Sequence, residues 1–206
     1  MKLKDMTVAE FINATNSKAP VPGGGSIAAL NAALSAALIA MVAGLTLDSP
    51  KYAAVHEKMQ AIKTEADELQ AKFIRYIDED SEAFDQVMAA FKMPKGTEEE
   101  QKARSEAIQA AYKTAASVPF AVATSANKLL NLANEVVLHG NQSALSDCAV
   151  ATLNARSAIM GAFYNVKINL TSIKDQQFVQ ELTTKMQEIE SALPATEHAV
   201  LANTKL

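Results

Sequence analysis

The chain has 206 residues, of which 49% are hydrophobic and 20% charged; this is the composition of a globular protein and excludes a disordered one. The 19 Lys and Arg against 23 Asp and Glu leave a net charge of −4, so no basic excess is available for binding nucleic acid. A single Cys and three scattered His exclude a disulfide framework and predict no metal site. The first residues, MKLKDMTVAE, lack the apolar core of a secretory signal, and we expect a soluble, cytoplasmic protein.

Low counts of Gly (7) and Pro (6), with abundant Ala and Leu, favour helices, and no run of alternating Val, Ile and Thr predicts a strand. We therefore expect an all-α, multi-helix bundle that forms one domain over residues 1–206. Pro119 is expected to kink or restart its helix, and Pro194 to end the last long one. In chain order, the expected helices are a short one opened by the capping box TVAE at 7–10, then 26–46, 50–91, a segment from the capping box TEEE at 97–100 to Gly140, 143–170 and 175–192.

The uncharged segment 26–47 is long enough to cross a membrane. It is rich in Ala, contains polar residues and has no flanking basic cluster, so we expect a long, buried central helix and no membrane partner. Its small side chains allow neighbouring helices to approach closely. A helix that is apolar all round needs partners on every side, which favours a homodimer. Large apolar residues recur along one stripe of it, at Ile27, Leu30, Leu34, Leu38, Met41 and Leu45.

Two carboxylates stand out among apolar neighbours. Asp80 follows Ile77 by three residues and precedes Phe84 by four, so it falls within the apolar seam of its helix, where a carboxyl group is a candidate for acid–base chemistry. Asp147 and Arg156 are the only charges between Val136 and Lys167. The alternatives are structural: Asp80 lies at a helix edge and reaches solvent, and Asp147 lies in a first turn, where the helix dipole favours it.

The turn Gly23-Gly24-Gly25-Ser26 is a candidate ligand-binding turn. Glycines permit positive φ and close backbone approach, and the helix start that follows presents free N–H groups. The alternative is that the glycines only turn the chain into a buried helix. Asn165 and Asn169 lie one helical turn apart, and Asn141 follows a helix end; their amides suit a heterocyclic ligand, or else serve as caps and interhelical hydrogen bonds.

Several segments, in the same order along the chain, resemble the cyclodeaminase/cyclohydrolase family, which comprises the C-terminal half of formiminotransferase-cyclodeaminase and stand-alone bacterial proteins. The resemblance covers about residues 5 to 200. It implies an all-helical homodimer that binds a tetrahydrofolate derivative as its substrate, with no covalently bound cofactor. The segments that carry it are PVPGGGSIAALNAALSAALIAMVAGLTL, DEDSEAFDQVMAAFKMPK, SVPF, GNQSALSDCAVATLNARSA and NVKINLTSIKD.

The family reaction implied is formation of 5,10-methenyltetrahydrofolate from 5-formiminotetrahydrofolate with release of ammonia. Within it, Asp80 and Asp147 are expected to act as acid–base or cation-stabilising groups, and the turn 23–26 to approach the ligand. Polar groups of the ligand are expected to meet Asn141, Asn165 and Asn169, and its glutamate carboxylate to meet Arg156 or Lys167. Three alternatives stay open: a methenyltetrahydrofolate cyclohydrolase, a non-catalytic folate-binding dimer whose carboxylates line no groove, and a membrane-associated bundle.

Overall fold

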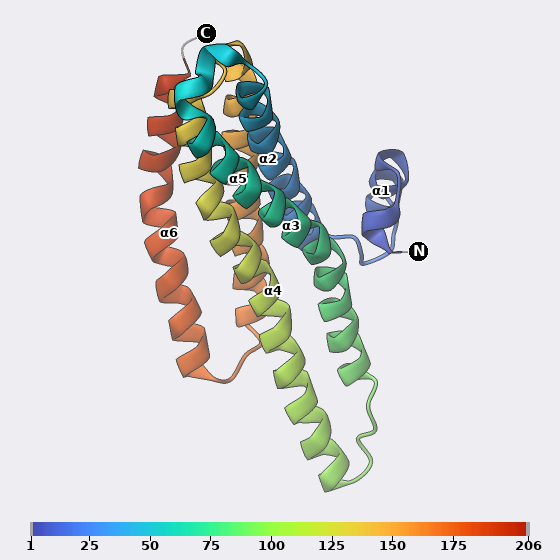
Figure 1. Ribbon diagram of the computed structural model, residues 1–206. Coiled ribbons are helices and arrows are strands. Elements are labelled where there is room, and N and C mark those ends of the chain that lie inside the picture. The colour runs from blue at the N-terminus through green and yellow to red at the C-terminus, as the bar shows by residue number, and fades with distance from the viewer. Residues whose placement is uncertain (1, 205–206) are drawn as a thin grey trace.

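The computed structural model describes residues 2–204, and within this range every regular element is a helix, which confirms the predicted all-α class. The five helices α2 to α6 run side by side, and the core lies between them (Figure 1). The elements are η1 (Leu3–Asp5), α1 (Val8–Thr15), α2 (Gly24–Leu47), η2 (Pro50–Val55), α3 (His56–Phe91), α4 (Glu98–His139), η3 (Gln142–Ala144), α5 (Leu145–Leu170) and α6 (Gln176–Asn203).

The capping boxes predicted at 7–10 and 97–100 are confirmed, whereas α2 begins at Gly24, two residues before its expected start, and residues 50–55 form the separate 3-10 helix η2 ahead of α3. In α1 and α4 the N-cap Thr accepts a hydrogen bond from the N–H of the residue three positions on, whose Glu side chain accepts one from the N-cap N–H. Asp175 caps α6 by accepting from two backbone N–H groups, and Gly140 is the C-cap of α4. Local sequence therefore determines where these helices begin and end.

The central helix α2 is buried on one side only, which corrects the expectation of a fully buried helix. Its alanines pack against α3 and α5, and Ala29, Ala32 and Ala36 are fully buried. Half of the stripe of large residues faces outward, since Leu34, Met41 and Leu45 are 41–47% exposed, while Ile27, Leu30 and Leu38 are half-buried against the core. Small side chains face the neighbouring helices because they permit the closest approach of the backbones. α2 also has the length and composition of a membrane span, although 56% of its most apolar window is buried within the bundle.

Neither internal proline ends its helix. Pro119 lies inside α4, which continues through it without the restart that was one of the two expected outcomes, and Pro194 lies inside α6, so the stop expected there is wrong. Each proline removes one backbone N–H and leaves the carbonyl four residues earlier without its helical partner. Pro194 is exposed, so water can hydrate that carbonyl, and Leu193 and Val200 on either side of Pro194 bury the same face of α6. Tertiary packing therefore outweighs the local penalty.

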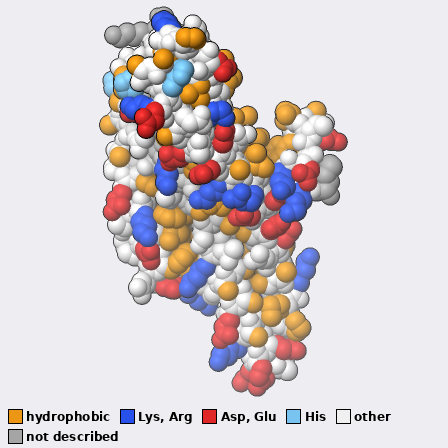
Figure 2. All heavy atoms as spheres, in the orientation of Figure 1, with side chains coloured by type: hydrophobic (Ala, Val, Ile, Leu, Met, Phe, Trp, Pro, Cys, Tyr) orange, Lys and Arg blue, Asp and Glu red, His pale blue; other side chains and the backbone are white. Residues whose placement is uncertain are grey.

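The ends of α3 and α4 form a hairpin that projects beyond the other helices, while α1 stands apart from the bundle (Figure 1). On the face in view, basic and acidic side chains are interspersed and form no continuous basic area (Figure 2). Where the hairpin leaves the bundle, α2 begins and α5 ends, and this junction holds the site described next.

Candidate functional site

A cavity of about 440 Å³ opens at the junction of α2, α3, α4 and α5. Its walls combine the glycine turn, one carboxylate and two amides with a row of apolar side chains. Sequence segments more than 140 residues apart thus meet here, among them the two that were singled out at 23–26 and 165–169. The lining residues are Pro20, Val21, Gly23, Gly24, Gly25, Asp80, Phe84, Val87, Met88, Phe91, Tyr112, Ala115, Asn165, Ile168, Asn169, Thr171 and Ser172.

Asp80 is the carboxylate in this wall, and it lies over the first turn of α2. The Ser26 hydroxyl is 3.1 Å from Asp80 Oδ2, and it also reaches the Ile77 carbonyl oxygen at 3.0 Å and the Ser81 hydroxyl at 3.2 Å. The Ser26 backbone N–H donates to the same carboxylate. Asp80 therefore occupies the free N–H groups that the sequence had suggested for a ligand anion.

Gly25 and Gly24 provide room for these side chains. A Cβ on Gly25 would lie 2.0 Å from Asp80 Oδ1, and a Cβ on Gly24 would lie 3.0 Å from Asn165 Nδ2. No glycine in the described chain has positive φ, so the conformational reason proposed for this turn is wrong, and Gly24 and Gly25 serve instead to admit the Asn165 and Asp80 side chains. Gly23, the N-cap of α2, meets only an ordinary contact with a backbone oxygen at 3.5 Å.

Burial raises the pKa of Asp80 above the usual value for an aspartate, and the hydrogen bonds from Ser26 only partly oppose this shift. Loss of water disfavours the charged carboxylate, and no Lys or Arg lies among the described residues of the cavity wall to restore it. Asp80 is half-buried in this wall, so it lies neither within the core nor freely in solvent. A carboxyl group whose pKa is moved toward neutrality is suited to accept and return a proton.

The two amides of the wall are held by α5 itself. Asn165 Nδ2 donates to the Gly161 carbonyl oxygen at 2.9 Å, which leaves Asn165 Oδ1 as an acceptor on the cavity side. Asn169 Nδ2 donates to the carbonyl oxygens of Asn165 and Ala115, both at 2.9 Å. Ala115 lies four residues before Pro119, so Asn169 satisfies the carbonyl that this proline leaves unpaired.

The other proposed site residues lie away from the cavity in this chain. Asp147 is in the first turn of α5, 18 residues from Asn165, or about 27 Å along the helix axis. Asn141 caps η3 near the far end of α2, where its N–H donates to Thr46 Oγ1 at 2.9 Å. Within one chain, Asp147 and Asn141 therefore do not meet Asp80, Asn165 and Asn169. The period of a helix predicts which face a residue lies on, but not which end of the bundle it reaches.

The two cations expected to meet a ligand carboxylate are already paired with α6. Arg156 Nε lies 2.9 Å from Glu197 Oε2, and Lys167 Nζ lies 2.5 Å from Glu190 Oε1. Both pairs join α5 to α6 on the side away from Asp80, and neither Arg156 nor Lys167 lines the cavity. Each of these two cations therefore forms an ion pair between helices.

The sequence interpretation missed the apolar wall. Phe91 and Met88 are 42% and 41% exposed, and the Tyr112 ring meets the Phe91 ring edge to face with centroids 6.2 Å apart. Ile168 is 67% exposed at the opposite wall. Phe84 and Phe91 belong to the apolar seam of α3 that drew attention to Asp80, and continuing that seam past Asp80 would have found this wall.

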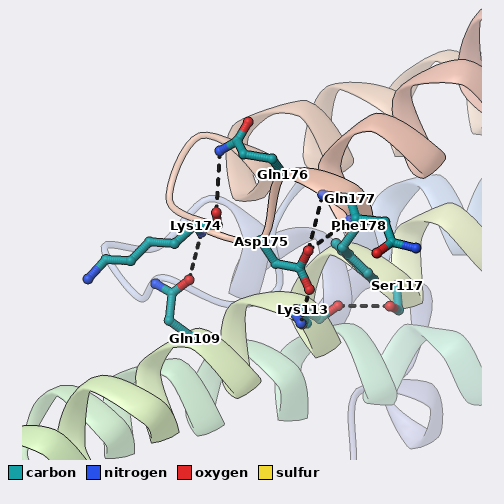
Figure 3. A network of polar contacts seen from close by, with 8 residues as sticks. All are labelled: Gln109, Lys113, Ser117, Lys174, Asp175, Gln176, Gln177 and Phe178. Atoms are coloured by element: carbon teal, nitrogen blue, oxygen red, sulfur yellow. Dashed lines mark hydrogen bonds and ion pairs between the residues drawn. The ribbon is translucent and has the colours of Figure 1, made fainter.

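The loop between α5 and α6 closes one side of the cavity through Thr171 and Ser172, and α4 holds this loop in place. The Gln109 side chain donates to the Ser172 carbonyl oxygen at 2.9 Å and accepts from the Lys174 N–H at 2.7 Å. Lys113 pairs with Asp175 at 2.7 Å. Figure 3 shows the contacts of Gln109 with Lys174 and of Lys113 with Asp175, which reach from α4 to the start of α6. They fix the wall without themselves lining the cavity.

Comparison with known proteins connects this site to one family. The family model described as formiminotransferase-cyclodeaminase matches residues 7–188. The methenyltetrahydrofolate cyclohydrolase of Methylorubrum extorquens is 37% identical over 91% of this chain and 88% of that protein. The formimidoyltransferase-cyclodeaminase of Gallus gallus is 34% identical over 83% of this chain, which spans only 32% of that protein. The crystal structure of formiminotetrahydrofolate cyclodeaminase from Thermotoga maritima superposes with a TM-score of 0.88 at 28% identity and covers 98% of both chains.

Proposed function

Because the chain belongs to the formiminotransferase-cyclodeaminase family, we propose that it is a tetrahydrofolate one-carbon enzyme, and specifically a formiminotetrahydrofolate cyclodeaminase. One observation carries the proposal: a carboxylate with a raised pKa, Asp80, lies in a cavity whose remaining walls are apolar groups and amides. A non-catalytic dimer was expected to have no open groove beside its carboxylates, and this cavity counts against that alternative.

The chemistry that Asp80 would perform is a proton transfer between two nitrogens of the substrate. In the protonated formimino group, N10 attacks the carbon attached to N5, and a C–N10 bond forms. N10 then loses a proton to Asp80, and Asp80 gives a proton to the amino group, which leaves as ammonia when its C–N bond breaks. The product is the 5,10-methenyl cation, and the Asp80 carboxylate stabilises the positive charge as it spreads over the bridge.

The cavity wall around Asp80 is suited to hold such a ligand in a reactive geometry. Asn165 Oδ1 is available to accept a hydrogen bond from a ring N–H, while Gly24 permits the close approach of that amide to the turn. The apolar side chains of Met88, Phe91 and Ile168 offer a surface for an aromatic ring. Holding N5 and N10 beside one proton carrier reduces the entropic cost of ring closure.

A second reaction is supported by the relative from Methylorubrum extorquens, which is named as a cyclohydrolase and which this chain covers almost completely. In that reaction water adds to the methenyl carbon, and Asp80 would accept one of its protons. The C–N5 bond then breaks as the remaining hydroxyl proton passes to N5, which leaves a formyl group on N10. The same carboxylate, placed beside the same carbon, serves both reactions.

The deciding experiment offers both substrates separately to the purified chain. Cyclodeamination of 5-formiminotetrahydrofolate is measured by the absorbance of the methenyl product and by ammonia release. Hydrolysis of 5,10-methenyltetrahydrofolate is measured by the loss of that absorbance above the uncatalysed rate. Ammonia release at an enzymatic rate supports the first proposal, hydrolysis alone supports the second, and no acceleration of either overturns both.

We also propose that the functional protein is a homodimer in the cytoplasm, formed through an apolar face on α2 and α5. The two helices pack side by side, since Ser35 Oγ donates to the Ala151 carbonyl oxygen at 2.7 Å. The apolar face then ends at Ile168, a residue of the cavity wall. The apolar face consists of the exposed side chains Leu34, Met41, Leu45, Val150, Leu153, Tyr164 and Ile168.

A further inference from the structure

The cavity has a polar end and an apolar end. The apolar end has no positively charged side chain in its described wall, although the carboxylates of a folate would need one there. Asp80 and Phe91 both lie on α3, about 16 Å apart along its axis. A reduced folate carries its pterin at one end and the carboxylates of glutamate at the other, with an aromatic ring between them. Among the described residues that line the cavity, no Lys or Arg is present for those carboxylates.

Arg104, on α4, lies directly behind the apolar end. Its guanidinium stacks on the Phe91 ring at 5.5 Å from the ring centroid. Its Nε and Nη2 donate to the Phe91 carbonyl oxygen at 3.3 and 3.0 Å. Phe91 is the last residue of α3, so its carbonyl has no partner within the helix, and Arg104 caps the helix end there. The side chain is therefore fixed against a residue of the cavity wall.

Arg104 keeps capacity for an anion. A guanidinium has five N–H donors, and the contact with Phe91 uses two of them. Among residues 2–204, no carboxylate oxygen lies within 4.0 Å of Arg104. Two other basic side chains near the cavity are instead paired: Lys113 with Asp175 and Lys167 with Glu190. A positioned, unpaired guanidinium is the group that best binds a carboxylate through two parallel hydrogen bonds.

We infer that Arg104 binds the glutamate carboxylate of the folate substrate, with the aminobenzoyl ring of that substrate lying against Phe91 and Met88. The inference rests on the proposed function and adds to it the residue that recognises the far end of the ligand. Arg104 replaces the two cations that the sequence had suggested for this task, Arg156 and Lys167. It is a binding residue, remote from the reacting nitrogens.

The test compares two substrates that differ only in glutamate: 5-formiminotetrahydrofolate and the corresponding tetrahydropteroate, which ends at the aminobenzoate. Arg104→Ala and Arg104→Gln are measured with both. We expect KM for the folate to rise at least about tenfold in both variants, with kcat within about threefold of the parent, because a charge-assisted contact is lost. KM for the pteroate should not change. Arg104→Gln retains an amide donor for the Phe91 carbonyl and so separates the lost charge from the lost helix cap.

Lys102→Ala is the matched control, because it removes an equal charge from an exposed position two residues earlier on α4. Its KM for the folate should stay within about twofold. The inference is overturned if the Arg104 variants leave KM for the folate unchanged, or if they raise KM for both substrates equally, as a loosened hairpin would. If the parent turns over neither substrate, the proposed function fails. In that case, calorimetry measures the binding of tetrahydrofolate and tetrahydropteroate to the parent and to the Arg104 variants. The inference predicts that the variants bind tetrahydrofolate more weakly than the parent does and bind tetrahydropteroate as well as the parent.

Discussion

Asp80 illustrates how two opposing effects act on one side chain. The first turn of α2 supplies N–H donors and the positive end of a helix dipole, which favour the carboxylate. Burial in an apolar wall opposes them and prevails, so the pKa of Asp80 is raised. The folded protein therefore favours the neutral carboxyl. The stabilisation that this group provides is complete at acid pH, below the ordinary aspartate pKa, and is lost as pH rises through the raised pKa.

Replacing Asp80 with Asn should separate stability from activity. Asn cannot exchange a proton, so we expect turnover to fall at least about 100-fold. At neutral pH, Asp80→Asn should melt at a higher temperature than the parent, because the cost of a buried charge is removed. The gain should shrink as pH falls. Thermal melts at neutral and acid pH, together with the methenyl assay, check both effects.

Asp85→Asn, an exposed position on the same helix, serves as the control and should leave turnover unchanged. Asp147→Asn tests the second carboxylate; from its place at the far end of α5 we expect turnover to be retained. If Asp80→Asn is less stable than the parent at neutral pH, stabilisation of the charged carboxylate by the helix N-terminus outweighs the cost of burying that charge.

Gly25 is required for space. In Gly25→Ala the new Cβ would lie 2.0 Å from Asp80 Oδ1, so the carboxylate must shift. We expect a loss of about 1–3 kcal/mol in the free energy of unfolding and a marked loss of turnover. Gly44→Ala is the control in the same helix, since its Cβ would be 3.8 Å from the nearest atom, Lys63 Cε. It should stabilise the protein by up to about 1 kcal/mol. Urea unfolding measures the change in the free energy of unfolding for both variants. Equal changes in Gly25→Ala and Gly44→Ala would contradict the steric argument.

At the scale of elements, a proline in one helix is matched by an amide in another. Pro119 leaves the Ala115 carbonyl without a helical partner, and the Asn169 amide of α5 supplies one at 2.9 Å. The same amide donates to the Asn165 carbonyl and lines the cavity. This pairing lets α4 continue through a proline and fixes the register between α4 and α5 at the site.

A double-mutant cycle measures this coupling. Asn169→Ala leaves the Ala115 carbonyl unpaired and should cost about 1–3 kcal/mol in the free energy of unfolding. Pro119→Ala restores a backbone N–H four residues after Ala115, so in this background Asn169→Ala should cost clearly less. Urea unfolding of the parent, both single variants and the double variant yields the coupling energy. Additive effects would show that the amide does not compensate for the proline.

The whole molecule leaves the apolar face on α2 and α5 uncovered. Leu34 and Leu153 are each 47% exposed and belong to helices joined by the Ser35–Ala151 hydrogen bond. A surface of this kind is typical of an interface between subunits. The proposed homodimer would cover it and enclose the Ile168 side of the cavity.

Charge placed on this face should dissociate the dimer. We expect the parent to have the mass of two chains in light scattering, and Leu34→Glu and Leu153→Glu to shift the protein toward the mass of one, because a charge in an apolar interface loses its hydration. Thr64→Glu, on the exposed polar side of α3, should leave the mass unchanged. A monomeric parent would contradict the proposal.

Local patterns in the sequence determined the class of the fold, the capped starts of α1, α4 and α6, and the end of α4 at Gly140, because these depend on residues within one or two helical turns. The odd position of Asp80 in an apolar seam was also visible locally. Only the tertiary structure decided that Asp80, Gly25 and Asn165 meet while Asp147 stays at the far end of α5. It also decided that α2 buries most of its alanines and exposes Leu34 and Leu45. Both outcomes depend on how helices pack against one another, and periodicity along a single helix does not contain that information.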